Sequence, residues 1–265
     1  MNFSTMLKEI RMIAREAGAA ILSVSARDFT VELKADRSPV TEADRAADRI
    51  ICTGLARLRP ALPVLSEESA LTPWAQRRRW KRYWLVDPLD GTREFVKGNG
   101  EFTVNIALIE DHRAVLGVVL APALSLEFCG ALGQGAWRRE ADGPPVATRV
   151  CRRPPAPLRV MGSRSHPGPG LSAYLRKLGS YRITPMGSSL KACLVADGQA
   201  DIYPRLGPTW EWDTAAAQAI LESAGGGMID LAGQPLRYNT KDRLTNPQFL
   251  AVGNPERDWL SAVHS

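Results

Sequence analysis

The chain has 265 residues, of which 45% are hydrophobic, and its 34 Lys and Arg outnumber 28 Asp and Glu to give a net charge of +6. This length and apolar content supply a full buried core, so an intrinsically disordered chain is excluded. The positive charge favours anionic partners in general, but it does not distinguish a nucleotide from nucleic acid or a membrane surface.

The cysteine spacing and the apolar runs indicate the cellular compartment. The four cysteines are widely spaced and form no CxxC pair, which indicates neither a zinc site nor a disulfide framework and is typical of a reducing cytosol. Residues 1–4 open an amphipathic stretch, and the uncharged run 114–126 is too short and too interrupted by proline to span a bilayer. We therefore expect a soluble, cytoplasmic protein without a cleaved signal.

Two amphipathic helices are predicted near the start of the chain. Apolar residues at steps of three and four from Leu7 to Val24 predict a helix with one buried stripe, capped by Ser4. A second helix is predicted from Thr41 to about residue 59. Asp44 is expected at its third position, where a carboxylate satisfies free N–H groups.

Five apolar segments after these helices predict a β-sheet. They are residues 64–65, 83–86, 103–109, 114–120 and 126–129, and the third and fourth are expected to form a hairpin across 111–113. The first half of the chain is therefore predicted to be a sheet covered by the two helices.

A proline-rich segment, residues 152–157, cannot easily form regular structure and is predicted to separate two halves. The halves are an α+β unit, 1–153, and an α/β unit, 154–265. In the second half, strands are predicted at 158–161 and 202–203, and helices at about 171–178, 189–196 and 214–224. The glycines at 225–227 are expected to end the last helix.

The run Asp-Pro-Leu-Asp-Gly-Thr at 87–92 places two carboxylates and a hydroxyl directly after the apolar segment 83–86. Pro88 disfavours the helical region for Asp87 and fixes its own φ, so the strand is expected to end extended and then turn sharply at Gly91. Two carboxylates this close repel each other unless a cation lies between them, and Mg²⁺ prefers oxygen ligands of this kind. The run therefore predicts a metal-and-phosphate site.

Three further acids stand at the ends of predicted elements. Glu67 and Glu68 follow an apolar strand, and Asp213 lies in Trp-Glu-Trp-Asp at 210–213. The loops of an open α/β sheet converge at such ends, so acids remote in sequence can meet there. Taken singly, however, each is more often a solvated loop acid or a helix cap, and the residues alone leave both interpretations open.

As a set, these motifs resemble the lithium-sensitive, Mg²⁺-dependent phosphatases related to inositol monophosphatase. The segments similar to the bacterial 3′(2′),5′-bisphosphate nucleotidases of that family are 38–44, 65–68, 83–95, 100–105 and 187–191, and the resemblance extends from about residue 30 to 250. It implies a layered αβαβα sugar-phosphatase fold. It also implies hydrolysis of the 3′-phosphate of adenosine 3′,5′-bisphosphate to AMP and phosphate, which would clear a by-product of sulfate assimilation.

The resemblance implies two or three Mg²⁺ ions in the active site. Glu67, Asp87 and the backbone carbonyl of Leu89 would hold one ion, while Asp87, Asp90 and Asp213 would hold a second. Two metal ions roughly 3.5–4 Å apart can hold the attacking water and the leaving oxygen of an in-line displacement. Inhibition by lithium would follow from a small cation in one of these positions.

Thr92 and Asp44 each have two interpretations. Thr92 can be a helix cap after the Gly91 turn or the partner of Glu67 that orients and deprotonates the metal-bound water, and the two roles are compatible. Asp44 is either a helix cap or a group beside the metals, and the resemblance implies a catalytic role for Glu67, Thr92 and Asp44. The N–H groups of Gly91 and Thr92 are expected to face the phosphate at the positive end of the next helix.

Substrate contacts are expected from both halves. The resemblance implies that His166, Ser188, Lys191 and Arg205 contact the nucleotide. Those expected to meet the phosphate are Glu67, Leu89, Asp90, Gly91, Thr92 and Asp213. From the residues alone, His166 is either part of a polar turn or, beside Arg and Ser, a contact for a phosphate or ribose. Lys191 is expected to be an ordinary surface lysine of a helix, whereas the guanidinium of Arg205 suits a 5′-phosphate bidentately.

Other functions remain open at this stage. The basic run 77–82 contains Arg and Trp like a nucleic-acid surface, but no RRM or zinc-finger spacing accompanies it, so we expect a solvated loop and no nucleic-acid partner. The nearest alternative substrate is inositol monophosphate or another sugar phosphate. A non-catalytic anion- or RNA-binding protein is a further alternative. The oligomeric state and any peripheral attachment to the inner membrane are not set by the sequence.

Overall fold

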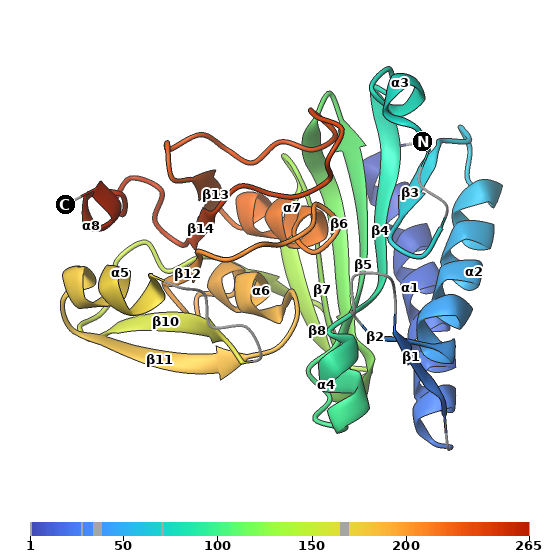
Figure 1. Ribbon diagram of the computed structural model, residues 1–265, viewed down its shortest axis with the longest axis horizontal. Coiled ribbons are helices and arrows are strands. Elements are labelled where there is room, and N and C mark those ends of the chain that lie inside the picture. Colours follow the sequence, from blue (N-terminus) through green and yellow to red (C-terminus); the bar gives the residue numbers. More distant parts are fainter. Residues whose placement is uncertain (1, 28, 34–38, 70–71, 165–169, 265) are drawn as a thin grey trace.

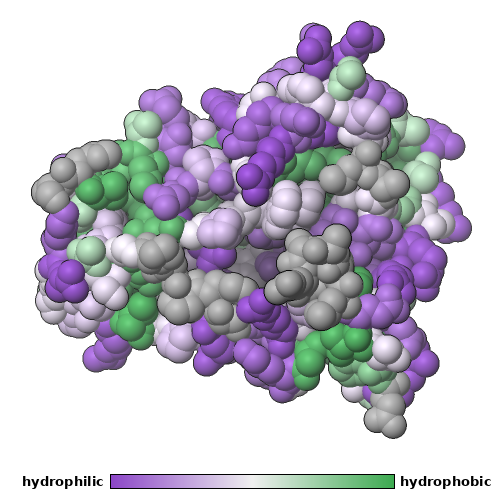
Figure 2. Space-filling model, viewed as in Figure 1, coloured by the Kyte–Doolittle hydropathy of each residue, from purple (hydrophilic) through white to green (hydrophobic). Residues whose placement is uncertain are grey.

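The computed structural model describes residues 2–27, 29–33, 39–69, 72–164 and 170–264, which form two main β-sheets and the helices around them (Figure 1). Five layers follow one another: outer helices, a seven-stranded sheet, two central helices, a five-stranded sheet and further outer helices. The predicted αβαβα arrangement is confirmed. Figure 2 shows that one face is hollowed near its middle, with hydrophilic residues around the hollow.

The seven-stranded sheet has the order β3-β4-β5-β6-β7-β8-β9, and its neighbours run antiparallel except for the parallel pair β3–β4. Its strands are β3 (Val64–Ser66), β4 (Arg82–Asp90), β5 (Thr103–Glu110), β6 (Arg113–Ala121), β7 (Leu126–Ala131), β8 (Gly135–Glu140) and β9 (Val146–Thr148); η1 (Pro122–Leu124) is a 3-10 turn after β6. Asp111 and His112 join β5 to β6 with φ values of 46° and 65°, which suit a tight hairpin. The predicted hairpin is confirmed, whereas β8 and β9 were not predicted.

Two outer helices, α1 (Phe3–Ser25) and α2 (Glu42–Arg57), cover one face of this sheet (Figure 1). Asn2, not Ser4, caps α1, because its side chain accepts a hydrogen bond from the Thr5 N–H at 2.9 Å. The helix begins earlier than predicted since buried Met6 extends the apolar stripe toward the N-terminus. Within the described part of the chain, no helix is both long and apolar enough to cross a membrane.

The central helices, α6 (Leu190–Ala196) and α7 (Ala215–Ser223), lie between the two sheets. Alanines let α7 approach the seven-stranded sheet very closely. A Cβ built on Gly117 of β6 would lie only 2.3 Å from the carbonyl oxygen of Ala216, so glycine is required there. This close packing fixes the start of α7, and with it Asp213, above the seven-stranded sheet.

The five-stranded sheet has the order β11-β10-β12-β14-β13. Its strands are β10 (Leu158–Ser163), β11 (Tyr181–Met186), β12 (Ile202–Arg205), β13 (Gly227–Asp230) and β14 (Phe249–Val252). Its outer face packs against α5 (Leu171–Leu178) and α8 (Ser261–His264) around buried Tyr174 and Trp259. The sequence predicted β10, β12 and α5 but not β11, β13, β14 or α8.

In the sequence, all strands of the seven-stranded sheet precede residues 152–157 and all strands of the five-stranded sheet follow them. One buried apolar cluster nevertheless contains residues of both, from Leu65 of β3 to Ala251 of β14. Cores that are shared in this way hold two sheets together as one packed unit. The division into halves 1–153 and 154–265 stays a prediction.

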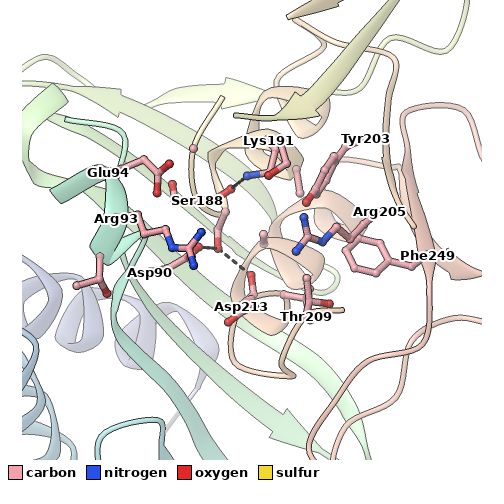
Figure 3. Close-up of a pocket in the computed structure, with 18 of the residues that line it drawn as sticks. Asp90, Arg93, Glu94, Ser188, Lys191, Tyr203, Arg205, Thr209, Asp213 and Phe249 are labelled. Carbon is pink, nitrogen blue, oxygen red and sulfur yellow. Dashed lines mark hydrogen bonds between the residues drawn. The ribbon is translucent and has the colours of Figure 1, made fainter. Parts of the chain in front are cut away.

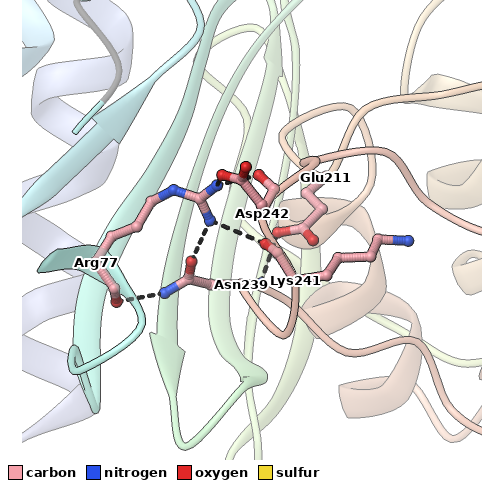
Figure 4. A network of polar contacts seen from close by, with 5 residues as sticks. All are labelled: Arg77, Glu211, Asn239, Lys241 and Asp242. Atoms are coloured by element: carbon pink, nitrogen blue, oxygen red, sulfur yellow. Dashed lines mark hydrogen bonds and ion pairs between the residues drawn. The ribbon is translucent and has the colours of Figure 1, made fainter. Parts of the chain in front are cut away.

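Arg77, in the short helix α3 (Trp74–Arg77), corrects the expected solvated loop. Its side chain is only 3% exposed and donates to the Asn239 side-chain oxygen at 2.5 Å and to the Lys241 carbonyl at 3.2 Å (Figure 4). The Asn239 side-chain amide donates back to the Arg77 carbonyl, and its backbone N–H donates to the Glu211 carboxylate at 2.7 Å. Arg77 therefore anchors the loop that holds the segment just before Asp213.

Candidate active site

The predicted acidic turn is part of β4, which continues to Asp90 instead of ending at Val86. The strand contains an irregularity, since Asp87 lies opposite Asn105 and Asp90 lies opposite Thr103. Pro88 lies within it, where a missing N–H does not break the ladder. The Leu89 N–H donates to the Asp87 carboxylate at 3.1 Å and tightens the bulge. The bulge therefore holds both carboxylates beside the neighbouring strand.

Glu67 is brought to the same place by the parallel pairing of β3 with β4. Its backbone N–H donates to the Val86 carbonyl at 3.2 Å, so Glu67 lies beside the residue that precedes Asp87. Asp213 comes from the turn before α7, where its carboxylate accepts from the Trp210 N–H at 2.9 Å. The fold thus gathers acids from three separate segments.

Ser189 links Asp90 to the turn before α7. Its hydroxyl lies 2.6 Å from the Asp90 carboxylate and 2.8 Å from the Asp213 carbonyl oxygen, and it accepts from the Asn105 amide at 2.7 Å. Sequence reasoning missed both Ser189 and Asn105. A polar residue in the otherwise apolar strand Thr-Val-Asn-Ile was the available signal for Asn105, since a buried amide requires hydrogen-bond partners.

Burial and nearby carboxylates strongly perturb the pKa values of Asp87 and Asp213. Burial raises the pKa of Asp87 well above its usual range, and repulsion from Glu67, Asp90, Asp213 and Asp44 raises it further. The pKa of Asp213 is likewise raised well above its usual range by burial, then by Asp90 and Glu67. Asp87 is only 1% exposed, so solvent screens this repulsion poorly. A cation bound among these groups would relieve it.

The donor set fits Mg²⁺ chemically, because it offers several carboxylates and the Leu89 carbonyl. The side-chain oxygen of Asn105 is also buried beside Asp90 and has no hydrogen-bond partner among the described residues. Among the described residues, no three Asp, Glu, His or Cys side chains are already arranged as ligands of one ion. Asp90 accepts a hydrogen bond from Ser189 at 2.6 Å and Asp213 accepts one from the Trp210 N–H at 2.9 Å, so protein donors hold both carboxylates in place.

The acids face a pocket of about 220 Å³ that opens between the two sheets. Among the predicted residues, its lining includes Glu67, Asp90, Gly91, Thr92, Ser188, Lys191, Arg205 and Asp213. Figure 3 shows Asp90 and Arg93 on one side and Tyr203 and Arg205 on the other. Arg93 and Tyr203 were not predicted.

Three of the predicted residues that the structure describes do not line this pocket. Asp44, Asp87 and Leu89 are almost fully buried behind its wall. His166 lies outside the residues that the structure describes.

Thr92 contacts Asp44 in the structure. Its hydroxyl lies 3.2 Å from the Asp44 carboxylate and 3.4 Å from the Leu89 carbonyl oxygen. The helix-cap interpretation of Thr92 is wrong: Gly91 is the N-cap of α4 (Thr92–Lys97), with a φ of 92° that favours glycine. Asp44 is also a helix cap as predicted, since it completes the capping box of α2 with Thr41. Thr41 ends β2 (Pro39–Thr41), which pairs with β1 (Val31–Leu33). The place of Asp44 beside the metals stays a prediction.

Lys191 is not the surface lysine that its helix suggested. It is 5% exposed, and its ammonium group donates to the carbonyls of Met186 at 3.3 Å and Ser188 at 2.5 Å. It lies 5.3 Å from the centre of the Tyr203 ring, as in a cation–π contact. Burial, opposed by Asp90 and assisted by Arg205, lowers the pKa of Lys191 to about 8. The pocket wall opposite the acids is therefore cationic.

Comparison with known proteins agrees with this architecture. The family model described as "Inositol monophosphatase family" matches residues 3–257. The chain is 49% identical over 246 residues to 3′(2′),5′-bisphosphate nucleotidase CysQ of Escherichia coli O157:H7, covering 92% of this chain and 98% of that protein. The enzyme of that name from Haemophilus influenzae is 36% identical over 257 residues, which cover 97% of this chain and 96% of the relative.

A solved structure extends the similarity to three dimensions. CysQ from Bacteroides thetaiotaomicron, a bacterial member of the inositol monophosphatase family, superimposes with a TM-score of 0.83 at 38% identity and covers 95% of this chain and 97% of its own. High identity and a matching fold thus extend over nearly the full length of the chain. The chain belongs to the inositol monophosphatase family.

Proposed function

We propose that this protein is a Mg²⁺-dependent, lithium-sensitive 3′(2′),5′-bisphosphate nucleotidase that hydrolyses adenosine 3′,5′-bisphosphate to AMP and phosphate. The observation that carries the proposal is one pocket with two chemically different walls: one has the acids, with Arg93 beside Asp90, and the other has Lys191 and Arg205. A substrate with two phosphates can present one to each wall. The relatives named as bisphosphate nucleotidases support the same substrate. The proposed role is to remove a by-product of sulfate assimilation.

The acids would hold two or three Mg²⁺ ions. Glu67, Asp87 and the Leu89 carbonyl are proposed for one ion, and Asp87, Asp90 and Asp213 for the second. Bound ions of this kind supply an activated water and neutralise the leaving oxygen. The hydrogen bonds of Ser189 and Asn105 near Asp90 would hold that carboxylate in position for its ion.

The chain's own groups would orient the reacting phosphate. The N–H groups of Gly91 and Thr92 lie at the start of α4, where no carbonyl within the helix can accept from them, so they are available to phosphate oxygens. Asp44 would fix the Thr92 hydroxyl through the contact at 3.2 Å, and Thr92 with Glu67 would then take the proton of the attacking water.

The second phosphate is proposed to bind at the cationic wall. Arg205 can grip a phosphate bidentately and Lys191 can neutralise it as a point charge. Ser188 and His166 are proposed as further nucleotide contacts, the first of which lines the pocket. We further propose a cytoplasmic location, in keeping with four free cysteines. Peripheral attachment to the inner membrane stays a prediction.

Phosphate release from two substrates tests the proposal. Adenosine 3′,5′-bisphosphate and inositol 1-phosphate are compared with and without Mg²⁺, and then with added Li⁺. The expected result is faster, Mg²⁺-dependent and Li⁺-inhibited release from the nucleotide. Faster release from the inositol ester would identify a sugar phosphatase instead. No release from either substrate would favour the anion- or RNA-binding alternative.

A further inference from the structure

Glu101 lies between the two turns that form the opposite walls of the pocket. Gly91 starts α4 on the side of the seven-stranded sheet, and Gly187 follows β11 of the five-stranded sheet. A Cβ built on Gly91 would lie 3.2 Å from the Glu101 carbonyl oxygen, and one built on Gly187 would lie 2.5 Å from the same atom. One peptide group therefore sets how closely the two turns approach.

The Glu101 side chain fastens the second turn. Its carboxylate accepts from the Arg164 Nε at 2.8 Å and Nη2 at 2.7 Å, which is the strong, bidentate geometry, and from the Gly187 N–H at 2.7 Å. Arg164 in turn donates to the Pro185 carbonyl at 3.0 Å. Burial raises the pKa of Glu101, but hydrogen bonds from Arg164 and Gly187 outweigh it, so the net pKa is lowered and the group is a carboxylate at neutral pH.

We propose that Glu101 is a positioning residue for substrate choice, which with Arg164 holds the turn of residues 187–191 at the distance from the Gly91 turn that a bisphosphate spans. The choice of substrate rests on the proposed function. Glu101 itself does not line the pocket, and it acts through the turn that carries Ser188 and Lys191. A substrate without the second phosphate has no group to bind Lys191 at the end of that turn.

The contact between Ser189 and Asp90 is supported separately. Asn105 holds the Ser189 hydroxyl from β5 at 2.7 Å, and this hydrogen bond does not involve Glu101. Loss of the Glu101 carboxylate should therefore loosen Gly187, Ser188 and Lys191 more than the acidic wall. The expected signature is a weaker grip on the second phosphate with little change in the chemical step.

The test compares Glu101→Ala and Glu101→Gln with the wild type on two matched substrates. Adenosine 3′,5′-bisphosphate and adenosine 3′-phosphate share the reacting ester and the base, and they differ only in the second phosphate. Glu127→Gln is the control, since Glu127 is likewise a carboxylate held by arginines, Arg11 at 2.5 Å and Arg15 at 2.7 Å, but against α1, away from the pocket. Its side chain is 3% exposed, compared with 14% for Glu101. Hydrogen exchange of the Gly187 amide is followed without substrate.

In Glu101→Ala, KM for the bisphosphate should rise about tenfold, as for the loss of one charge-assisted hydrogen bond network, with kcat within about twofold. KM for adenosine 3′-phosphate should stay unchanged, Glu101→Gln should fall between, and Gly187 should exchange faster in both. Glu127→Gln should leave both KM values and Gly187 exchange unchanged. Equal losses on both substrates, or unchanged exchange and KM in Glu101→Ala, would overturn the inference. A wild-type protein that releases no phosphate from the bisphosphate instead refutes the proposed function, and with it the choice of substrate.

Discussion

Replacing Gly117 with alanine should push α7 away from the seven-stranded sheet. The new Cβ would lie 2.3 Å from the Ala216 carbonyl oxygen and 2.9 Å from its Cα, and both are backbone atoms that no side-chain rotation can move. Ordinary contact requires the helix to shift by about 1 Å, and overpacking of this kind costs typically 1–3 kcal/mol and occasionally more. We expect about 3 kcal/mol here, or a fall in Tm of roughly 5–10 °C for a chain of this size.

The same shift should damage catalysis. Asp213 stands immediately before α7, and a displacement of about 1 Å in a catalytic array can cost about 100-fold in rate. Thermal unfolding followed by circular dichroism and Mg²⁺-dependent phosphate release are the two assays. Gly227→Ala is the matched control, because its Cβ would have Pro255 at 3.6 Å and Val252 at 4.0 Å, which is normal contact. Wild-type stability and turnover in Gly117→Ala would refute the packing argument.

Three further predictions concern charged groups. Asp90→Asn should abolish turnover and any Mg²⁺-induced rise in Tm without lowering Tm itself, because it removes repulsion from Asp87. The surface variant Asp142→Asn is the control. Near-normal turnover in Asp90→Asn would remove Asp90 from the metal site. Burial lowers the pKa of Lys191 to about 8, so Lys191 loses its charge as pH rises through that value. KM for the bisphosphate should therefore increase between pH 7 and 9, while KM for adenosine 3′-phosphate does not. Parallel pH profiles of the two KM values would contradict a contact between Lys191 and the second phosphate. Arg77→Ala should destabilise the fold by about 3 kcal/mol by leaving its buried partners unpaired, whereas exposed Arg79→Ala should stay within about 0.5 kcal/mol in urea unfolding.

Local patterns predicted the parts of the structure that local forces decide. The apolar stripe of α1, the Thr41–Asp44 capping box and the two-residue hairpin turn at Asp111 all depend on neighbours within a few residues. The acidic motif at 87–92 was likewise visible, although the bulge that lets β4 continue to Asp90 depends on pairing with Thr103.

What the sequence could not predict depends on distant partners. β11 is exposed along most of its length, so it lacks the alternation that marks a half-buried strand. Lys191 and Arg77 have the sequence surroundings of surface residues, yet both are buried because carbonyls from turns and loops accept their hydrogen bonds. The roles of Ser189 and Glu101 arise only when the two sheets are brought together. The spacing of apolar residues along the sequence thus does not reveal which polar residues are buried.

Because α7 packs closely on the seven-stranded sheet but follows it in the sequence, the sheet is synthesised before the helix that covers it. Every strand of that sheet precedes residue 149, whereas the helix that covers its inner face is Ala215–Ser223. A ribosome needs roughly 3–13 s to add the intervening residues at about 5–20 residues per second. During that interval the apolar face of the sheet around Gly117 has no covering helix. We therefore expect the nascent chain to be most prone to aggregation, and most dependent on chaperones, in that interval.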